Sequence, residues 1–225
     1  MQPPDHFQLV AASTSPVVPS EVEDLADLIE LRLDGCPDRE GAVEAVTCSL
    51  PVIVTNRPTW EGGTFEGDES DRLAILAEAM SHEQVVAVDI ELRTLQTPAG
   101  AALADQARAA GRWVIASVHD FEATPPRSEC ERLLRSAGLL GDVGKLAVTA
   151  ETPGDAAQLL AVTDSVARWG VRVSTMAMGA VGTHTRVVAP TYGSVLGYAP
   201  AVVDSPTATG QLPLETLRAM LSQLP

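Results

Sequence analysis

The stretch Val143-Gly144-Lys145-Leu146-Ala147-Val148 is a short apolar run that contains one charged residue, Lys145. Lys145 is the only lysine in the 225-residue chain, and every other basic side chain apart from histidine is an arginine. Turn residues flank the run, Gly141-Asp142 before it and Thr152-Pro153-Gly154 after it. A short apolar run between turn residues is typical of a buried strand.

A lysine on a buried strand has a specific chemical use. Burial favours the uncharged amine, and an uncharged amine attacks a ketone to form a Schiff base. The alternative is a lysine that snorkels or forms a structural ion pair at the end of a strand. An arginine would serve in such an ion pair equally well. The exceptional use of lysine therefore predicts that Lys145 is a nucleophile.

Composition and charge narrow the class of function. The chain has 30 acidic and 15 basic residues, a net charge of −15 and 45% apolar residues. The apolar content can bury a large core, while the negative charge argues against nucleic acid or an anionic membrane as the main partner. Arginine in place of lysine beside so many carboxylates favours adaptation to high salt, where screening tolerates self-repulsion. An acidic protein encoded by a GC-rich genome is the alternative.

The cysteines and the N-terminal residues indicate the compartment. Cys36, Cys48 and Cys130 lack the spacing of a disulfide framework or a metal site, which favours a reducing environment. The first residues show no basic region followed by an apolar run, and no apolar stretch reaches the roughly 18 residues of a membrane helix. We therefore expect a cytoplasmic protein without a metal site or a membrane partner.

Eight strand-like apolar runs alternate with helical patterns along the chain. The runs cover residues 7–12, 28–33, 51–56, 85–92, 113–118, 143–148, 171–176 and 194–199. Capping residues predict helix starts at Thr97-Pro98 and Thr152-Pro153, and Ser20 with Glu23 predicts a capping box. Because buried parallel strands have continuous apolar sequences, this order predicts a single (β/α)8 barrel over residues 1–225.

A doubly wound sheet is the alternative fold. It would usually carry a GxGxxG motif after the first strand, and none follows residues 7–12. The loop at about 200–213 is rich in proline, glycine and threonine, and loops of this length are often functional. We expect this loop to be a lid over the site.

Charged residues gather where the predicted strands end, which in a barrel is the catalytic face. Glu30, Arg32 and Asp34 alternate along the second run, which would point all three side chains into the barrel. Asp89 and Glu91 alternate in the same way in the fourth run. A purely structural network of buried ion pairs is the alternative interpretation.

Three further strand ends carry candidate functional residues. Arg57 follows the third run, and Glu61-Gly62-Gly63 follows in a loop whose glycines let the backbone approach a ligand. His119 ends the fifth run and is a candidate general acid and base. Arg186, after the seventh run, is a candidate clamp for a substrate carboxylate. A hydrogen-bonded core histidine and a solvated surface arginine are the alternatives.

Together these residues predict ketone chemistry on a small polyhydroxylated acid, without a cofactor. Imine formation acidifies the adjacent carbon, and a histidine can then move protons. The sequence shows no phosphate-binding glycine loop and no metal-ligand cluster, so phosphorylated substrates and metal catalysis rank lower.

The strand-end motifs resemble those of the type I 3-dehydroquinate dehydratases. Each motif is weak alone, but eight in the family's order, spanning residues 30–211, are specific. The matching motifs are Glu30-x-Arg32-x-Asp34, Arg57-x-x-x-Glu61-Gly62-Gly63, Asp89-Ile90-Glu91, Ser117-x-His119-Asp120-Phe121-x-x-Thr124-Pro125, Lys145-Leu146-Ala147-Val148, Met176-x-Met178-Gly179 with Arg186, Tyr192-Gly193-Ser194 and Gly210-Gln211.

The resemblance implies a reaction and a role for each matching residue. The family converts 3-dehydroquinate to 3-dehydroshikimate and water in the shikimate pathway, through a lysine imine and without a cofactor. By this resemblance Lys145 forms the imine, His119 moves the protons, and Glu61 orients or tunes His119. Homodimers are common in the family. Binding of the substrate is implied for Arg186 (its carboxylate), Glu30, Arg32, Arg57 and Gln211 (its hydroxyls), Met178 and Tyr198 (the pocket wall) and Thr207 (the lid).

The lid sequence of this chain departs from the family pattern. The lid of the family usually has the sequence Ser-Ala-Pro-Gly-Gln, whereas this chain has Thr207-Ala208-Thr209-Gly210-Gln211, and loss of the proline is expected to loosen the lid.

Two other functions are alternatives to the dehydratase. A class I aldolase or transaldolase would also use a barrel lysine, but such enzymes usually have a phosphate site after the last strands. A barrel that binds a metabolite of the pathway as a sensor is the alternative without catalysis.

Overall fold

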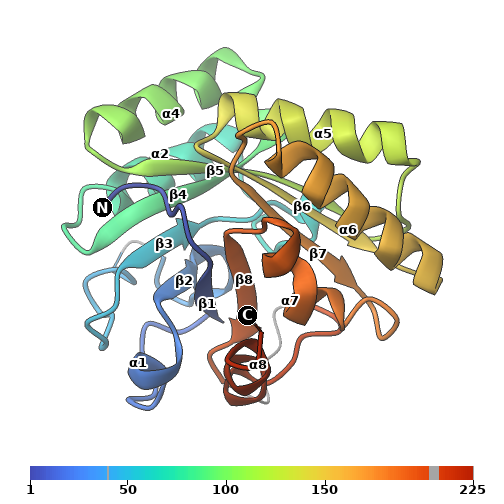
Figure 1. The fold of residues 1–225 in the computed structure, drawn as a ribbon. Helices are drawn as coiled ribbons and strands as arrows, with labels where there is room; N and C mark the ends of the chain where they lie inside the picture. Colours follow the sequence, from blue (N-terminus) through green and yellow to red (C-terminus); the bar gives the residue numbers. More distant parts are fainter. Residues whose placement is uncertain (40, 203–207, 225) are drawn as a thin grey trace.

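Eight parallel strands form one sheet in the order β7-β6-β5-β4-β3-β2-β1-β8 (Figure 1). The computed structural model describes residues 1–39, 41–202 and 208–224. The amide of Val195 donates to the carbonyl of Val173 at 2.8 Å, so the two ends of the sheet meet and nearly close it. The predicted (β/α)8 barrel is confirmed. Its strands are β1 Gln8–Ser13, β2 Leu28–Arg32, β3 Val52–Thr55, β4 Val85–Glu91, β5 Trp113–Asp120, β6 Val143–Thr149, β7 Val173–Met178 and β8 Leu196–Pro200.

Helices connect most of the strands and cover the outside of the barrel (Figure 1). The α-helices are α1 Val22–Leu25, α2 Glu69–Ala79, α3 Leu92–Leu95, α4 Pro98–Ala109, α5 Arg127–Leu140, α6 Pro153–Ala167, α7 Thr185–Val188 and α8 Leu214–Leu221. Three short 3-10 helices are η1 Leu33–Gly35, η2 Thr59–Glu61 and η3 Ala189–Tyr192. Between β2 and β3, the described residues form η1 and turns in place of an α-helix.

Two helices begin at the threonines that the sequence indicated. The Thr97 hydroxyl accepts from the backbone N–H of Gly100 at 3.1 Å, ahead of the proline that begins α4. Thr152 forms a full capping box with Asp155 at the start of α6. Each cap gives an otherwise unpaired N–H a partner and fixes where the helix starts.

The predicted capping box at Ser20 and Glu23 is wrong. The residue that precedes α1 is Glu21, and no side chain caps this helix. The Glu23 carboxylate accepts from the backbone N–H of Ser49 at 2.7 Å. A bond to a distant segment therefore takes the place of the local cap.

Alternation along the strands divides the apolar side chains between the two sides of the barrel wall. On β6, Val143 and Ala147 belong to the interior cluster together with Trp113 of β5. Leu146 and Val148 belong to the cluster that α5 and α6 cover. This alternation places Lys145 on the inner side of the wall, between Val143 and Ala147.

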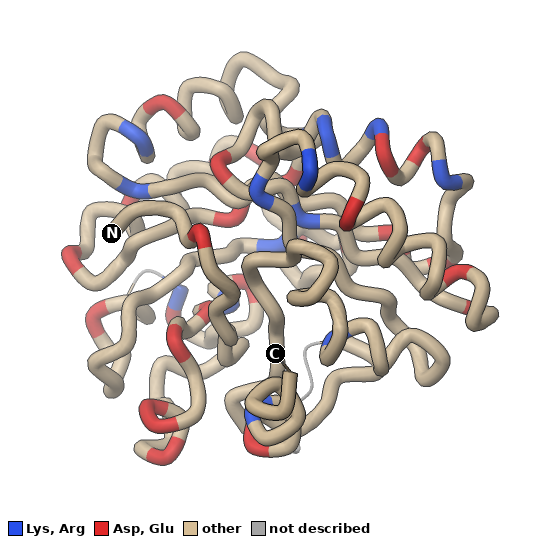
Figure 2. The backbone as a smooth tube through the Cα atoms, in the orientation of Figure 1, with Lys and Arg blue, Asp and Glu red and all other residues tan. Residues whose placement is uncertain are grey.

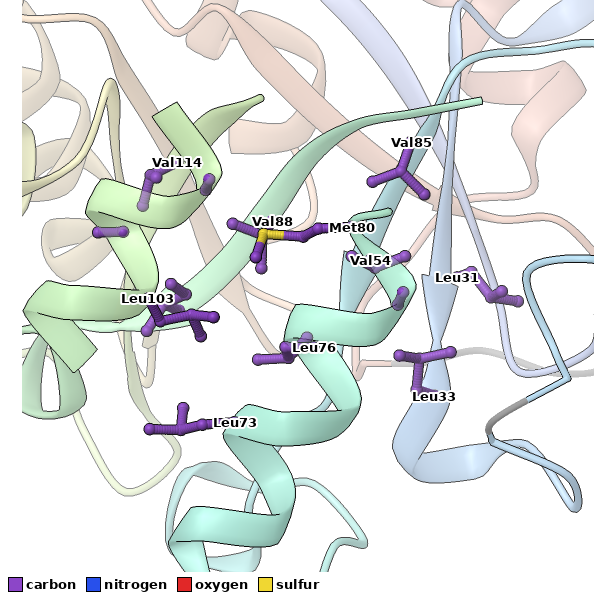
Figure 3. Packing of buried hydrophobic residues seen from close by; sticks show 14 of the residues in the cluster. Leu31, Leu33, Val54, Leu73, Leu76, Met80, Val85, Val88, Leu103 and Val114 are labelled. Atoms are coloured by element: carbon purple, nitrogen blue, oxygen red, sulfur yellow. The ribbon is translucent and has the colours of Figure 1, made fainter. Parts of the chain in front are cut away.

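A second cluster fixes helix α2 against the outside of the barrel. Leu73 and Leu76 of α2 pack with Val54 of β3, Val88 of β4 and Leu103 of α4 (Figure 3). Burial of a leucine side chain contributes roughly 1.5–3 kcal/mol. The helix is therefore held firmly beside the ends of β3 and β4, where the charged residues of the site begin.

The surface carries many charges that contribute little to the fold. Arginines and acidic residues are interspersed along α5 (Figure 2), and Arg127 pairs with Glu131 at 2.9 Å while Arg132 pairs with Glu129 at 2.6 Å. Exposed pairs of this kind stabilise a protein by about 0–1 kcal/mol each, and less in salt. Among the described residues, no helix has the length and apolar character needed to cross a bilayer.

Gly144 lies beside Lys145 where the backbone of α5 approaches β6. A Cβ at this position would lie 2.7 Å from the backbone nitrogen of Gly138 and 2.8 Å from the carbonyl oxygen of Leu134. We predict that Gly144→Ala lowers the free energy of unfolding by about 1–3 kcal/mol, because overpacking forces the helix away. Urea unfolding in high-salt buffer measures the change.

Gly154→Ala is the matched control for this prediction. A Cβ at Gly154, in α6, would meet only the Thr152 hydroxyl at 3.4 Å. This variant is expected to be neutral or slightly stabilising, because alanine favours a helix over glycine by up to about 1 kcal/mol. Equal stability of the two variants would contradict the close approach of α5 to β6.

Candidate active site

A cavity with about 520 Å³ of empty space lies among the C-terminal halves and ends of the strands. Ten of the predicted site residues line it. Thr207, also predicted, lies outside the described residues. The lining residues are Glu30, Arg32, Arg57, Glu61, Gly62, His119, Phe121, Lys145, Ala147, Met176, Met178, Arg186, Tyr198, Ala208 and Gln211.

Lys145 lies between two carboxylates and an aromatic ring. Its side chain is buried, and Nζ is 3.0 Å from Oδ2 of Asp89 and 3.6 Å from Oε1 of Glu30. Nζ also lies 4.2 Å from the centre of the Tyr198 ring, a cation–π distance. Two carboxylates and the face of an aromatic ring therefore surround the amine.

Arg57 is the hub of the buried charges. One nitrogen, Nη2, pairs with Asp89 at 2.8 Å. The other, Nη1, contacts Glu91 and the Ser117 hydroxyl, each at 2.6 Å, and lies 3.5 Å from Glu61. A planar guanidinium satisfies several acceptors at once, as a lysine ammonium could not with the same geometry. Arg57 thus balances carboxylates from β4 and from the loop after β3.

His119 and Glu61 form a hydrogen-bonded pair. Nδ1 of His119 is 2.9 Å from Oε2 of Glu61, across a separation of 58 residues in the sequence. Among the hydrogen bonds of the described residues, none joins His119 to Lys145. The two residues lie on neighbouring strands, and the β5–β6 register aligns Ser117 with Lys145 and His119 with Ala147. Both therefore face the same cavity from adjacent strands.

The pair holds its proton in an unusual place. Burial raises the pKa of Glu61 to about 8, although the charge of Arg57 opposes the rise. Burial also lowers the pKa of His119 well below its ordinary value, and the charges of Arg57 and Lys145 lower it further. At neutral pH the Glu61 carboxyl group is consequently protonated, and His119 is uncharged.

Asp89 stays ionised beside Lys145. Burial by itself would raise the pKa of this carboxyl group, but the charges of Arg57 and Lys145 outweigh burial and hold the pKa well below its usual range. A permanent carboxylate next to the amine can accept a hydrogen bond from it in either charge state.

Arg186 differs from Arg57 because, among the residues that the structure describes, no carboxylate pairs with it. The side chain is 3% exposed, and its Nη2 donates to the backbone oxygen of Thr209 at 3.3 Å. Within the described part of the chain, Nε and Nη1 have no hydrogen-bond partner. Burial lowers the pKa of this guanidinium to about 10. A buried, unbalanced fork of donors is suited to bind an anionic ligand group.

Tyr198 also presents an unused polar atom. The side chain is buried, and in the described structure its hydroxyl has no hydrogen-bond partner. Burial raises the pKa of the phenol well above its ordinary value, so the hydroxyl remains a donor. A polar ligand in the cavity could supply the missing partner.

The second strand differs from its prediction at one position. Glu30 and Arg32 line the cavity, but β2 ends at Arg32 and Asp34 lies in η1. The Asp34 carboxylate binds Arg32 at 2.8 Å and accepts from the backbone N–H groups of Arg57 and Thr64, each at 3.1 Å. Asp34 therefore fixes Arg32 and the loop after β3, and the expected alternation of all three side chains into the barrel is wrong.

The glycines after Glu61 have different uses. Gly62 has φ of 74°, lines the cavity and packs against the ring of Phe121, so a Cβ there would overlap that ring. A Cβ at Gly63 would overlap the backbone of Arg57. Phe121 in turn stacks on His119, with ring centres 6.0 Å apart. The two glycines let this loop bring Glu61 against the histidine.

Part of the predicted lid falls within the described residues. Ala208 and Gln211 line the cavity, and Oε1 of Gln211 accepts from the backbone N–H of Ala208 at 3.0 Å. Residues 203–207 lie outside the described part of the chain.

Two buried carboxylates that complete the site had no function predicted from the sequence. Asp89 and Glu91 were recognised by their alternation, and both are fully buried on β4. Their partners Lys145 and Arg57 are distant in the chain. The resulting arrangement offers a buried amine, a histidine with a tuned partner and an unbalanced arginine, a set suited to imine chemistry on an anionic ketone.

Comparisons with known proteins identify relatives of the whole chain. The family model described as type I 3-dehydroquinase matches residues 9–225. A 3-dehydroquinate dehydratase from Haloquadratum walsbyi is 48% identical, and the match covers 98% of this chain and 93% of that protein. One from Haloarcula marismortui is 42% identical, with 98% and 97% covered. The crystal structure of 3-dehydroquinate dehydratase from Geobacillus kaustophilus superposes with a TM-score of 0.83 at 25% identity, covering 96% of this chain and 90% of that one.

We predict that Arg186→Met stabilises the free protein. Within the described part of the chain, no carboxylate pairs with this buried charge. Replacing it with an apolar side chain of similar length removes its desolvation cost, by about 1–4 kcal/mol. Thermal unfolding in high-salt buffer measures the gain. Arg168→Met is the matched control, because Arg168 is largely exposed and its ion pair in the described structure is with Asp164; its effect should stay within about 0.5 kcal/mol. A less stable Arg186→Met variant would show that the buried arginine is already balanced.

Proposed function

Since this chain belongs to the type I 3-dehydroquinase family, hydro-lyases that remove water from 3-dehydroquinate in the shikimate pathway, we propose that it acts through an imine on Lys145. The observation that carries this proposal is the buried amine of Lys145, which lies in the cavity 3.0 Å from Asp89. The family assignment favours this reaction over an aldolase, a transaldolase or a sensor.

Imine formation begins when the Lys145 ammonium gives up a proton. Asp89 and Glu30 are the adjacent acceptors, at 3.0 and 3.6 Å. The free amine adds to the substrate ketone, and loss of water gives the iminium. The positive nitrogen then withdraws electrons from the neighbouring carbon and makes its proton more acidic. Asp89 and the Tyr198 ring lie beside that charge.

His119 is proposed to move the protons. The uncharged imidazole removes the proton from C2 of the imine and then delivers a proton to the hydroxyl that departs as water. Glu61, hydrogen-bonded to Nδ1 at 2.9 Å, sets the orientation and protonation of the ring. Hydrolysis of the product imine returns Lys145 to its free form.

Binding groups around the cavity are proposed to orient the substrate. Arg186 takes the carboxylate, because its fork of donors is buried without a carboxylate partner in the described structure. Glu30, Arg32, Arg57 and Gln211 bind the hydroxyl groups. Met178 and Tyr198 form the wall, and the Tyr198 hydroxyl is a further donor. The segment at about 200–213, with Thr207, is proposed to act as a lid.

We infer four further properties of the enzyme from its sequence and its resemblance to the family. We propose that the protein is a homodimer, as is common in the family, and that it resides in the cytoplasm and needs no cofactor. Adaptation to high salt is supported by the acidic composition and by relatives from Haloquadratum walsbyi and Haloarcula marismortui. Light scattering at several salt concentrations tests the dimer and the salt requirement together.

Substitution of the two central residues should have different effects on turnover. Lys145→Ala is expected to abolish dehydration of 3-dehydroquinate, and Lys145→Arg should do the same because it keeps the charge but loses the nucleophile. His119→Ala should slow turnover by about 10²–10⁴-fold, the usual contribution of general acid–base catalysis. Ultraviolet absorbance of the conjugated ketone product measures turnover, with circular dichroism as the check of folding. Near-wild-type turnover by either lysine variant would refute the mechanism.

The dehydratase should become more active as pH rises through the pKa of Glu61. While Glu61 is protonated its O–H donates to Nδ1, so the other ring nitrogen carries a proton and cannot act as a base. Above a pH of about 8 the carboxylate accepts from Nδ1–H, and the other nitrogen becomes free. We therefore predict that kcat/KM rises with pH with a midpoint near 8, since this ratio reports groups of the free enzyme.

Glu61→Gln provides the control for the pH profile. This variant has no carboxyl group to titrate beside His119, so the rise should disappear from its profile. A wild-type profile that is flat across this range, or a rise that persists in Glu61→Gln, would remove Glu61 from its assigned role.

A further inference from the structure

Arg72 is a fully buried arginine that does not line the cavity. It lies in α2, and the residue that follows it in the sequence is Leu73, whose side chain packs in the hydrophobic cluster between α2 and the barrel (Figure 3). Its guanidinium binds Glu69 through Nε at 2.8 Å and Nη2 at 2.7 Å, and Nη1 donates to the backbone oxygen of Asn56 at 2.8 Å. An arginine with no exposed surface requires such complete pairing.

One contact of Arg72 reaches inward to the active site. Its Nη2 lies 2.8 Å from Oε2 of Glu91, a carboxylate with no exposed surface. This contact is an ion pair without hydrogen-bond geometry, because Nη2 donates its hydrogen bonds to Glu69 and to the Thr94 hydroxyl. The other oxygen of Glu91, Oε1, binds Nη1 of Arg57 at 2.6 Å. Glu91 is thus held between two arginines, one on each oxygen.

The pairing continues from Arg57 to the nucleophile. Arg57 binds Asp89 at 2.8 Å, and Asp89 binds Nζ of Lys145 at 3.0 Å. Charges therefore alternate along a path that starts at the half-exposed Glu69 and ends at Lys145. The full path is Glu69, Arg72, Glu91, Arg57, Asp89 and Lys145.

We propose that Arg72 is a positioning residue for catalysis, which holds Glu91 and thereby keeps Arg57 aligned with Asp89 and Glu61. Without Arg72, Glu91 would depend on Arg57 alone and would draw its guanidinium away from the other two carboxylates. Burial already raises the pKa of Glu91, against the charges of Arg57 and Arg72. With Arg72 gone, Arg57 would be the cation left to hold this carboxylate ionised.

A purely structural role is the competing explanation. Arg72 also ties α2 to β3 through Asn56, so its loss would lower stability whether or not it affects the site. Arg218 offers a matched control, because it ties α8 to the region of α1. It donates to the backbone oxygen of Leu25 at 2.6 Å and pairs with Asp27 at 3.0 Å, away from the cavity.

The experiment compares Arg72→Met, Arg72→Lys and Arg218→Met in high-salt buffer. Thermal unfolding gives the stability of each variant, and steady-state kinetics with 3-dehydroquinate give kcat and KM. Arg72→Met is expected to lower kcat by about tenfold or more while KM changes less, because Arg57 orients the reacting groups. Its pH profile should shift to higher pH, because the buried cluster that contains Glu61 has lost a positive charge. Arg218→Met should lower stability but keep the wild-type kcat and pH profile.

Arg72→Lys separates the effect of the guanidinium's several hydrogen-bond donors from the effect of its charge. A lysine keeps the positive charge but cannot hold Glu69, Asn56 and Glu91 at once, so kcat should recover in part. If Arg72→Met does not fold, Arg72→Lys must still show a lowered kcat. The inference is overturned if the Arg72 variants that fold keep kcat within about twofold of Arg218→Met, whatever their stability.

This inference rests on the proposed function, and the two fail differently. If Lys145→Ala turns over like the wild type, the imine mechanism itself is wrong. If Lys145→Ala is inactive but the Arg72 variants behave like Arg218→Met, only the positioning role of Arg72 is wrong.

Discussion

The ion pair between Lys145 and Asp89, 3.0 Å long inside the barrel, is the interaction on which the rest of the site depends. A charge in this interior is costly unless a partner balances it, and Asp89 needs a second cation when the amine loses its proton. Arg57 supplies that cation at 2.8 Å. The need to hold Arg57 in turn explains the buried Glu91 and, behind it, Arg72.

Arg186 shows the opposite arrangement. The contrast distinguishes an arginine that holds other side chains in place from one whose donors are available to a ligand. Arg57 contacts Asp89, Glu91 and Glu61, whereas Arg186 is equally buried and, within the described structure, has no carboxylate partner. The free protein bears the desolvation cost of that charge. A substrate carboxylate would relieve it, so the cost in stability is also the source of affinity for an anion.

Much of this site followed from local sequence patterns, and the rest depended on contacts between distant segments. Lys145 was recognised from the apolar run around it and His119 from its position at a strand end. A period of two directed Glu30 and Arg32 into the barrel, and both line the cavity. The same rule failed at Asp34, where the strand had already ended and a 3-10 turn redirected the side chain. The contact of Glu61 with His119 was implied only by resemblance, since 58 residues separate them. The role of Arg72 could not be predicted, because an arginine next to several acidic residues in a helix usually lies exposed to solvent.

Trapping with borohydride tests directly whether Lys145 forms an imine with the substrate. The protein is mixed with 3-dehydroquinate in high-salt buffer, reduced, and its intact mass is measured, followed by peptide mapping. We predict a stable adduct on Lys145, with the mass expected for substrate or product joined to the amine and reduced. The site is simple to assign because the chain has one lysine. Folded protein that turns over substrate but yields no adduct would contradict the imine mechanism.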